Sequence, residues 1–181
     1  MTFDYIKIFR KIKWYKKTLH LLVWIALFSL LAPQTFTIPV KGATKSDYHP
    51  DSFWFYPWGK SGTHKGVDIF ARKGTSVVAS THGFILATGE NKRGGKFIFT
   101  LGPKLRVHYY AHLNSIKTKT GYWNNSGEKI GEVGSTGNAA GKPPHLHYSI
   151  ITLIPHFWKV DLSPQGWKKI FFLNPIEFIE K

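Results

Sequence analysis

Residues 144–153 of the chain read PHLHYSIITL. A proline precedes a run rich in aromatic and β-branched residues, which predicts a β-strand from His145 to Leu153. Six more candidate strands precede it, separated by Gly-rich or Pro-containing turns: 67–70, 76–79, 84–88, 96–101, 105–112 and 129–133. No long amphipathic helical pattern competes with them. Short, regularly spaced strands predict a mainly β domain of small antiparallel sheets, as a sandwich or open barrel, rather than a parallel βαβ fold.

Length and composition favour one compact domain. The chain has 181 residues, of which 43% are hydrophobic and 16% aromatic, with 17 glycines and 10 prolines. A chain of this length has room for one hydrophobic core and a short appendage. Cysteine is absent, which excludes disulfides, a thiolate zinc site and a cysteine nucleophile. Any metal site must therefore use histidine and carboxylate ligands.

The formal net charge of +15 indicates polyanionic partners. Nucleic acid, anionic lipid and the acidic polymers of a cell envelope all fit such a surplus. Six basic residues against Asp4 supply +5 of it before the first apolar run: Lys7, Arg10, Lys11, Lys13, Lys16 and Lys17. The positive charge is scattered, and the export segment described next would carry the chain away from nucleic acid, so we expect no nucleic-acid partner.

The N-terminal segment has the layout of an export signal. A basic cytoplasmic flank, residues 1–18, precedes LHLLVWIALFSLLA, residues 19–32, which carries no formal charge and is followed by Pro33. Because basic flanks remain in the cytoplasm, the rest of the chain is predicted to lie on the outer side of the cytoplasmic membrane, in the cell envelope or secreted. Residues 19–33 are thus predicted to be a signal sequence or a membrane anchor.

Two features bear on the choice between signal and anchor. Fourteen apolar residues are fewer than the roughly 20 of a membrane-spanning helix, but no charge occurs from Thr18 to Val40, so a tilted anchor fits. No small-x-small cleavage motif precedes Pro33, which favours an uncleaved anchor in the membrane. A buried core helix is the alternative, although an apolar helix without a polar face is unusual in so small a domain.

The remaining chain divides into a linker and a domain. Residues 34–46 mix Pro39, Gly42 and polar residues without periodicity, which predicts a linker, and residues 47–181 form the domain. We expect the aromatic residues of its C-terminal stretch to close the core, and a membrane-contacting patch is the alternative. These residues are Phe157, Trp158, Trp167, Phe171, Phe172 and Phe178.

Three short clusters carry the candidate chemistry: HKGVD at 64–68, YAHL at 110–113 and HLH at 145–147. On an extended strand, residues two or four apart point to the same face. His64 can therefore lie beside Asp68, and His145 beside His147. Each pair can converge on one point.

A catalytic zinc site without thiolates needs three nitrogen or oxygen ligands and an open position for water. Two histidines and Asp68 suffice, which leaves one histidine of the HLH pair, and also His112, for proton transfer. No glutamate follows the first ligand as it does in HExxH enzymes, so a histidine must act as the general base. Gly66 lacks a Cβ and lets the backbone pass close to the metal or substrate.

Five motifs occur together in one order. They are HxGxD at 64–68, GTxVxA…G at 74–83, YxHL at 110–113, IGxVGxTG at 130–137 and PHLH at 144–147. In this combination the chain resembles the lysostaphin-type, or LytM-like, zinc metalloendopeptidases. The resemblance covers residues 64–150, and Asn174-Pro175 is similar to the end of such domains.

The resemblance implies roles for five residues. His64, Asp68 and His147 would bind one zinc ion per domain, and His112 and His145 would be catalytic. The implied fold is a small, mainly antiparallel β domain with a narrow groove. The implied substrate is a stem peptide or peptide cross-link of peptidoglycan, and the resemblance leaves room for protein regulators.

A non-catalytic LytM-like module that binds the wall and activates another hydrolase is the alternative. Such modules usually lose zinc ligands, whereas this chain keeps the whole set, which favours the enzyme. Two departures from the family bear on specificity, because loops set specificity on a fixed scaffold. Ser149 follows Tyr148 where relatives often have glutamate, and the spacer 113–126 is unusual. Four histidines match no motif and are predicted to be structural or surface residues: His49, His82, His108 and His156.

Overall fold

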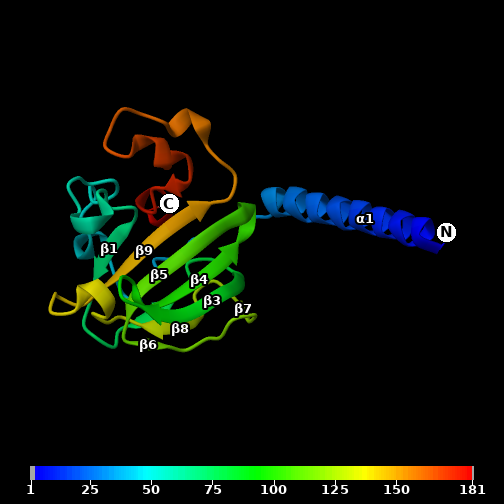
Figure 1. Cartoon of the computed structure of the whole chain (residues 1–181). Helices are drawn as coiled ribbons and strands as arrows, with labels where there is room; N and C mark the ends of the chain where they lie inside the picture. The colour runs from blue at the N-terminus through cyan, green and yellow to red at the C-terminus, as the bar shows by residue number, and fades with distance from the viewer. Residues whose placement is uncertain (1–2, 181) are drawn as a thin grey trace.

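The structure is a computed structural model, which describes residues 3–180 and, within them, the side chains of residues 14–21 and 23–180. One long helix precedes a domain of short antiparallel strands (Figure 1). The α-helices are α1 (Phe3–Leu31) and α2 (Ile176–Ile179). The strands are β1 (Val67–Phe70), β2 (Ser76–Val78), β3 (Gly83–Asn91), β4 (Gly95–Gly102), β5 (Arg106–Leu113), β6 (Ser115–Ile116), β7 (Trp123–Asn124), β8 (Lys129–Glu132), β9 (His145–Thr152) and β10 (Phe172–Leu173). Short 3-10 helices are η1 (Lys45–Asp47), η2 (Gly59–Ser61), η3 (Pro103–Leu105), η4 (Gly137–Ala139), η5 (Phe157–Lys159) and η6 (Gly166–Ile170).

The strands form two sheets. The larger has the order β1-β9-β5-β4-β3-β7, with β10 also paired to β9, and the smaller has the order β2-β8-β6. All pairs are antiparallel, which confirms the predicted mainly β, antiparallel fold; the sheets are open and form no closed barrel among the described residues. The seven predicted strands match β1, β2, β3, β4, β5, β8 and β9, with ends that differ by a few residues in β3.

The core lies on one face of the larger sheet, because successive side chains of a strand point to opposite faces. In β9, Leu146, Tyr148 and Ile150 are fully buried in the core, as are Val67 and Ile69 of β1. The same cluster includes Val77 of β2 and Ile130 of β8, from the smaller sheet. The alternate residues of β1 and β9 are therefore on the opposite face, away from the core.

The segment between α1 and η1 is in contact with the domain. Backbone hydrogen bonds join Thr37 to Ser80, Val78 to Pro39 and Lys41 to Ser76, over 2.8–3.0 Å. Val40 is buried in the core cluster, and Phe36 and Ile38 pack against it. The residues predicted as a linker, 34–46, thus add a short extended stretch beside β2.

Helix α1 extends away from the domain (Figure 1). Its described apolar side chains are exposed along its length, among them Trp24, Phe28 and Leu31. Within the described residues, no helix meets the combined length and apolarity needed for a membrane span. The predicted basic flank lies partly outside the described side chains, which begin at Trp14.

The prediction that the C-terminal aromatic residues close the core is wrong for four of them. Phe157, Trp158, Trp167 and Phe171 are 70%, 77%, 60% and 36% exposed. Leu173, Ile176 and Ile179 fill the core in their place, and Phe178 packs against it. The reason is that the chain leaves β9 in a loop over 153–171, outside the sheet, and only returns to the core through β10 and α2.

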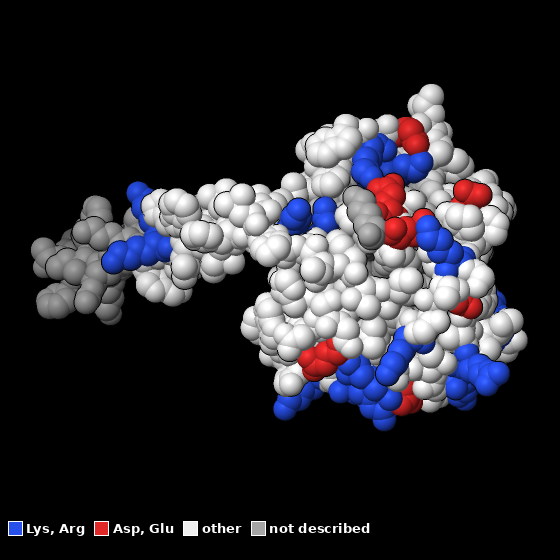
Figure 2. Space-filling view, turned by 180° about the vertical axis from the view of Figure 1, so that it is seen from behind, with Lys and Arg blue, Asp and Glu red and all other residues white. Residues whose placement is uncertain are grey.

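Basic and acidic side chains are mixed on the back of the domain. Figure 2 shows this face, where most acidic groups lie next to Lys or Arg. Ion pairs join Lys129 to Glu132 at 2.9 Å and Lys45 to Glu180 at 3.0 Å. On this face the surplus of positive charge is partly neutralised.

Candidate metal and catalytic site

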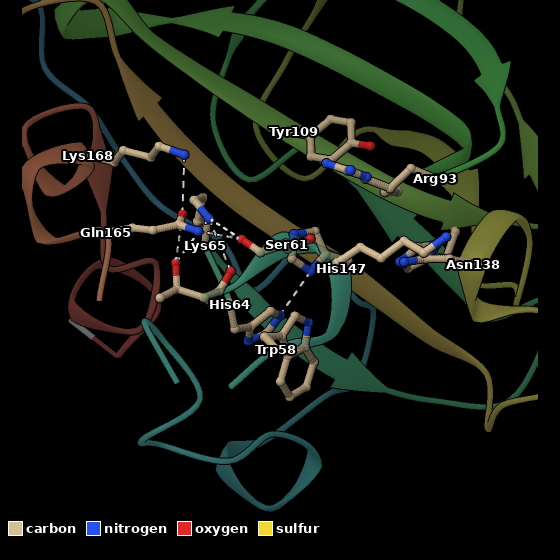
Figure 3. A pocket seen from close by; sticks show the side chains of 15 residues that line it. Trp58, Ser61, His64, Lys65, Arg93, Tyr109, Asn138, His147, Gln165 and Lys168 are labelled. Atoms are coloured by element: carbon tan, nitrogen blue, oxygen red, sulfur yellow. Dashed lines mark hydrogen bonds between the residues drawn. The ribbon is translucent and has the colours of Figure 1, made fainter. Parts of the chain in front are cut away.

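A groove lies over the face of β1, β9 and β5 that points away from the core. Its cavity is about 340 Å³, and Figure 3 shows side chains from several loops around it. His64, His112 and His147 line this groove. An adjoining hollow is lined by Asp68, His145 and, again, His112 and His147. The five residues singled out in the sequence therefore lie in one region.

Strand register places Asp68 beside His147. The two are Cα partners in the antiparallel pair of β1 and β9. Gly66 permits this close pairing, because a Cβ there would lie 2.4 Å from the Tyr148 carbonyl and 2.5 Å from Ser149 Oγ. The need for glycine thus arises from the approach of the backbone to β9. A side chain at residue 66 would push β1 away from His147.

His64 reaches the same point from outside the strand. It lies before β1 rather than on an extended strand, so the same-face argument from sequence does not describe it. Its side chain is 1% exposed and stacks on Trp58, with ring centroids 4.2 Å apart. Nδ1 lies 2.9 Å from the Ser52 carbonyl oxygen, which can only accept, so Nδ1 donates.

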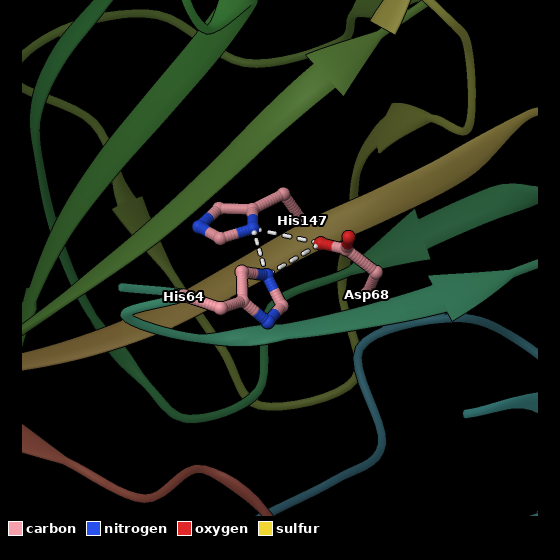
Figure 4. Close-up of side chains that lie close together, drawn as sticks. All are labelled: His64, Asp68 and His147. Carbon is pink, nitrogen blue, oxygen red and sulfur yellow. Dashed lines mark hydrogen bonds and ion pairs between the residues drawn. The ribbon is translucent and has the colours of Figure 1, made fainter. Parts of the chain in front are cut away.

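Three ligand atoms converge, as Figure 4 shows. His147 Nδ1 is 2.8 Å from Asp68 Oδ1, and His64 Nε2 is 3.0 Å from Oδ1 and 3.1 Å from His147 Nδ1. Ligands about 2.0–2.1 Å from a tetrahedral ion would be about 3.3 Å apart, close to these separations. Two imidazole nitrogens and a carboxylate oxygen are donors that suit zinc in the absence of thiolates.

The protons of this cluster also favour a cation. Since His64 Nδ1 carries a proton, the neutral ring presents a lone pair at Nε2. His147 Nε2 lies 3.0 Å from Ser149 Oγ, which can accept its proton and leave a lone pair at Nδ1. Three lone pairs then face one another over about 3 Å, an arrangement that a cation stabilises.

The electrostatics of the ligands agree with metal binding. Burial raises the pKa of the Asp68 carboxyl, but His147 and His64, in the forms that carry a proton toward it, outweigh that effect through hydrogen bonds and charge and hold its pKa far below the usual range. Burial lowers the pKa of His147, against the opposing effect of Asp68. At neutral pH the cluster therefore contains a carboxylate and a neutral His147, the forms in which both bind metals.

His112 and His145 lie beside the cluster with one ring nitrogen each fixed by the backbone. His112 Nδ1 is 2.9 Å from the Thr136 carbonyl, and His145 Nδ1 is 2.8 Å from the Pro143 carbonyl. Both Nδ1 atoms therefore donate, and both Nε2 atoms are free to accept a proton. The two rings are 5.1 Å apart between centroids, and His145 Nε2 is 3.9 Å from Asp68 Oδ2.

The backbone at His112 is held in an uncommon conformation. Its φ is 63°, in the left-handed region that non-glycine residues rarely occupy. Hydrogen bonds to Gly94 through its backbone N–H and to Thr136 through its ring fix this geometry. Burial lowers the pKa of His112 to about 4, with help from His147 and His145. The ring is thus neutral at pH 7, the form in which its Nε2 can accept a proton.

Several groove residues were not found from the sequence. Trp58 and Arg93 come from irregular segments, where no periodicity places a side chain. Tyr109 and Ala111 lie two residues apart on β5, and both line the groove. Burial raises the pKa of Tyr109, so its hydroxyl stays protonated. Ser149 does not line the groove but contacts His147 Nε2, and it has a usable signal, because it follows His147 by two residues on the same strand face.

The other histidines are structural or exposed, as predicted. His108 is fully buried, with Nδ1 2.6 Å from Tyr148 Oη, at the opposite end of β5 from the groove. His49 is exposed, and its Nδ1 accepts from the Asp51 N–H. His82 and His156 are partly buried; His156 stacks on Trp158, and His82 makes a tilted ring contact with Trp123.

Comparisons with known proteins agree with this geometry. An L-Ala–D-Glu endopeptidase of Bacillus subtilis is 37% identical over 129 residues, which are 66% of this chain and 38% of that protein. The chain thus spans well under half of the curated relatives it matches first. The catalytic domain of lysostaphin from Staphylococcus simulans has a similar structure, with a TM-score of 0.56 and 26% identity over 86% of this chain and 98% of that domain.

A zinc-containing peptidase from Vibrio cholerae is also similar in structure. Its TM-score is 0.53 at 26% identity, over 64% of this chain and 36% of that protein. The family model described as peptidase family M23 matches residues 62–157, a range that holds all five histidine and aspartate residues of the site and more than half of the chain. On that match, and with a fold shared with lysostaphin, the chain belongs to peptidase family M23.

Proposed function

We propose that this protein is a zinc metalloendopeptidase that hydrolyses peptide bonds in bacterial cell-wall peptidoglycan. The observation that carries the proposal is the convergence of His64 Nε2, Asp68 Oδ1 and His147 Nδ1 beside two further histidines with free Nε2 atoms. His64, Asp68 and His147 would hold the ion. His112 and His145 would carry out proton transfer.

The reaction divides between the metal and the two histidines. When bound, zinc would act as a Lewis acid on the attacking water and on the scissile carbonyl. His112 and His145 would share two tasks: one Nε2 would accept the proton of the water and pass it to the leaving amine, and the other ring, protonated from solvent at Nε2, would donate a hydrogen bond to the oxyanion. Their Nδ1–H groups stay bonded to Thr136 and Pro143, which fixes the rings in place.

Peptidoglycan is proposed as the substrate from the relatives. These relatives include an L-Ala–D-Glu endopeptidase, a peptidoglycan DD-endopeptidase and lysostaphin. Exposed residues such as Trp58, Lys60 and Arg93 form part of the groove lining, which supports a segment of a polymer as substrate over an enclosed small molecule. We propose no further partner beyond the wall peptide.

We also propose that the domain acts outside the cytoplasmic membrane. The support is the basic stretch that ends at Lys17, followed by the uncharged residues 18–40 and the exposed apolar surface of α1. An alkaline phosphatase fused after Lys181 should be active in cells. An inactive phosphatase fusion together with an active cytoplasmic reporter at the same point would overturn export, and release by high salt alone would overturn an anchor.

Digestion of purified peptidoglycan tests the function. The zinc-loaded full chain should release fragments with new peptide termini and uncut glycan strands, detected by mass spectrometry. Chelation should stop the release, and added zinc should restore it. If wild type and a metal-retaining His145→Ala variant both released nothing, yet both stimulated a separate hydrolase, the chain would be a wall-binding activator instead of an enzyme.

A further inference from the structure

The groove at the candidate site is lined by cations and by no acidic residue. The groove and the hollow that continues it share the walls formed by Trp58, Ser61 and Asn138. Their basic lining residues are Lys60, Lys65, Lys92, Arg93, Lys142 and Lys168, and neither lining includes Asp or Glu. Asp68, which belongs to the proposed metal site, lines the adjoining hollow instead. The back of the domain, with its mixed charges, differs in this respect (Figure 2).

The cations come from separate parts of the fold. Arg93 lies in the turn between β3 and β4, Lys60 in η2 and Lys168 in η6. In Figure 3, Lys168 and Arg93 flank His64 and His147 from opposite sides. A peptide in the groove would therefore meet positive charge on both sides of the scissile bond.

Two of these cations have no hydrogen-bond or ion-pair partner, within the described residues, that would offset their charge. Within the described part of the chain, neither the Arg93 guanidinium nor the Lys60 ammonium forms a hydrogen bond or an ion pair. Lys168 Nζ contacts two neutral groups, the Gln165 amide oxygen at 3.3 Å and the Trp167 ring, whose centroid is 5.3 Å away. Like charges gathered in one groove repel one another, so their grouping costs stability unless an anion binds there.

We infer that the groove selects peptides with free carboxylates close to the scissile bond, and disfavours peptides in which those groups are amidated or absent. Arg93 and Lys168 are the specificity-determining residues. An Arg guanidinium binds a carboxylate through two hydrogen bonds, and both cations attract it over longer distances. For cleavage, this inference rests on the proposed function, whereas for binding it stands alone.

A matched pair of stem peptides tests the inference. The acid is L-Ala-γ-D-Glu-L-Lys-D-Ala, and its partner carries a carboxamide in place of the free α-carboxylate of D-Glu. Binding of fluorescently labelled peptides to the metal-free full chain is measured by anisotropy, because zinc itself would bind a carboxylate. We expect the acid to bind about tenfold more tightly at low salt, and this ratio to shrink as salt is added.

Variants connect the preference to the two cations. Arg93→Gln and Lys168→Gln should each reduce the ratio by about two- to fivefold, and together they should nearly abolish it. The control is Lys73→Gln with Lys119→Gln, two exposed lysines outside the groove, which removes the same net charge and should leave the ratio unchanged.

Cleavage assays on the same peptides, with zinc, separate two kinds of failure. Equal binding of acid and amide, or a ratio that survives in the double variant, would overturn the selectivity. If neither peptide nor whole peptidoglycan were cut while the binding ratio held, the enzyme proposal would fail and the selectivity would stand. If both peptides were cut with equal efficiency and bound equally, the enzyme would stand and the selectivity would fail.

Discussion

Asp68 Oδ1 lies 2.8 Å from His147 Nδ1, across the paired strands β1 and β9, and this contact is fixed by strand register. His64 completes the group from the loop before β1. The arrangement predicts that replacing His64, Asp68 or His147 by alanine lowers zinc affinity at least about a hundredfold, since each removes one of three protein ligands. His145→Ala and His112→Ala should keep one zinc per chain. Elemental analysis after dialysis distinguishes the ligand variants from the catalytic ones. If His147→Ala kept zinc and His145→Ala lost it, His145 would be the ligand and His147 would not.

A second prediction concerns stability with and without metal. At pH 8 the metal-free cluster places a carboxylate oxygen within 3.0 Å of two ring nitrogens. Asp68→Asn supplies an N–H donor at that point. The free energy of unfolding of the metal-free variant should therefore exceed that of metal-free wild type by about 1–3 kcal/mol, and its unfolding temperature should be higher.

Zinc should reverse that order. Wild type should gain about 4.1 kcal/mol at a free zinc concentration of about 1,000 times its Kd, more than the difference in the metal-free state, whereas the variant should gain much less. Asp161→Asn is the matched control, because Asp161 pairs with Lys169 away from the groove and its loss leaves the zinc effect intact. Thermal unfolding with chelator and with zinc measures both effects; equal shifts in wild type and Asp68→Asn would show that Asp68 does not bind the ion.

His112→Asn separates the imidazole from its backbone. Asparagine tolerates the left-handed conformation that His112 adopts at φ 63°, so the variant should fold and bind zinc like wild type. Turnover should fall at least about a hundredfold, the lower end of what a positioned acid or base contributes. His82→Asn, which lies outside the groove, should retain full activity. A rate close to wild type in folded, zinc-loaded His112→Asn would remove His112 from the mechanism.

Strand geometry explains why part of this site could be predicted. The pairing of His145 with His147 follows from their spacing of two on a strand, and β9 has these bounds in the structure. The partnership of β1 with β9 has no signal in a single sequence, because register between distant strands depends on the whole sheet. The resemblance to a known family implies only that Asp68 and His147 meet at one ion, without naming the strand pairing.

The parts that could not be predicted lie in irregular segments. Trp58 and Arg93 shape the groove from loops, where side-chain direction depends on turn geometry instead of a repeating period. β6, β7 and β10 have two residues each, too few for any periodicity to appear. Hydrophobicity alone gives the wrong prediction for Phe157 and Trp158, which are exposed, because apolar character does not show which side of a loop faces the protein.

His108 makes the domain sensitive to acid at a point remote from the groove. Its ring is fully buried between Phe36 and Tyr148, and its Nδ1 is 2.6 Å from Tyr148 Oη. Burial, together with the nearby charge of Arg106, lowers its pKa to about 3. The folded chain therefore keeps this ring neutral over a range in which the unfolded chain protonates it.

The sign of the resulting pH dependence follows from proton binding. Below a pH of about 6.5, the pKa of an unfolded histidine, the unfolded state binds a proton that the folded state does not bind until about pH 3. As the pH is lowered through this window, the free energy of unfolding should decrease by up to about 1.4 kcal/mol per pH unit. His108→Gln lacks this contribution, so between pH 7.5 and pH 5 wild type should lose about 2 kcal/mol more than the variant, measured by urea unfolding with chelator present. His49→Gln, at an exposed site, leaves His108 in place and should follow wild type. If His108→Gln and wild type lost stability in parallel, the buried ring would already be protonated in the folded chain at pH 5.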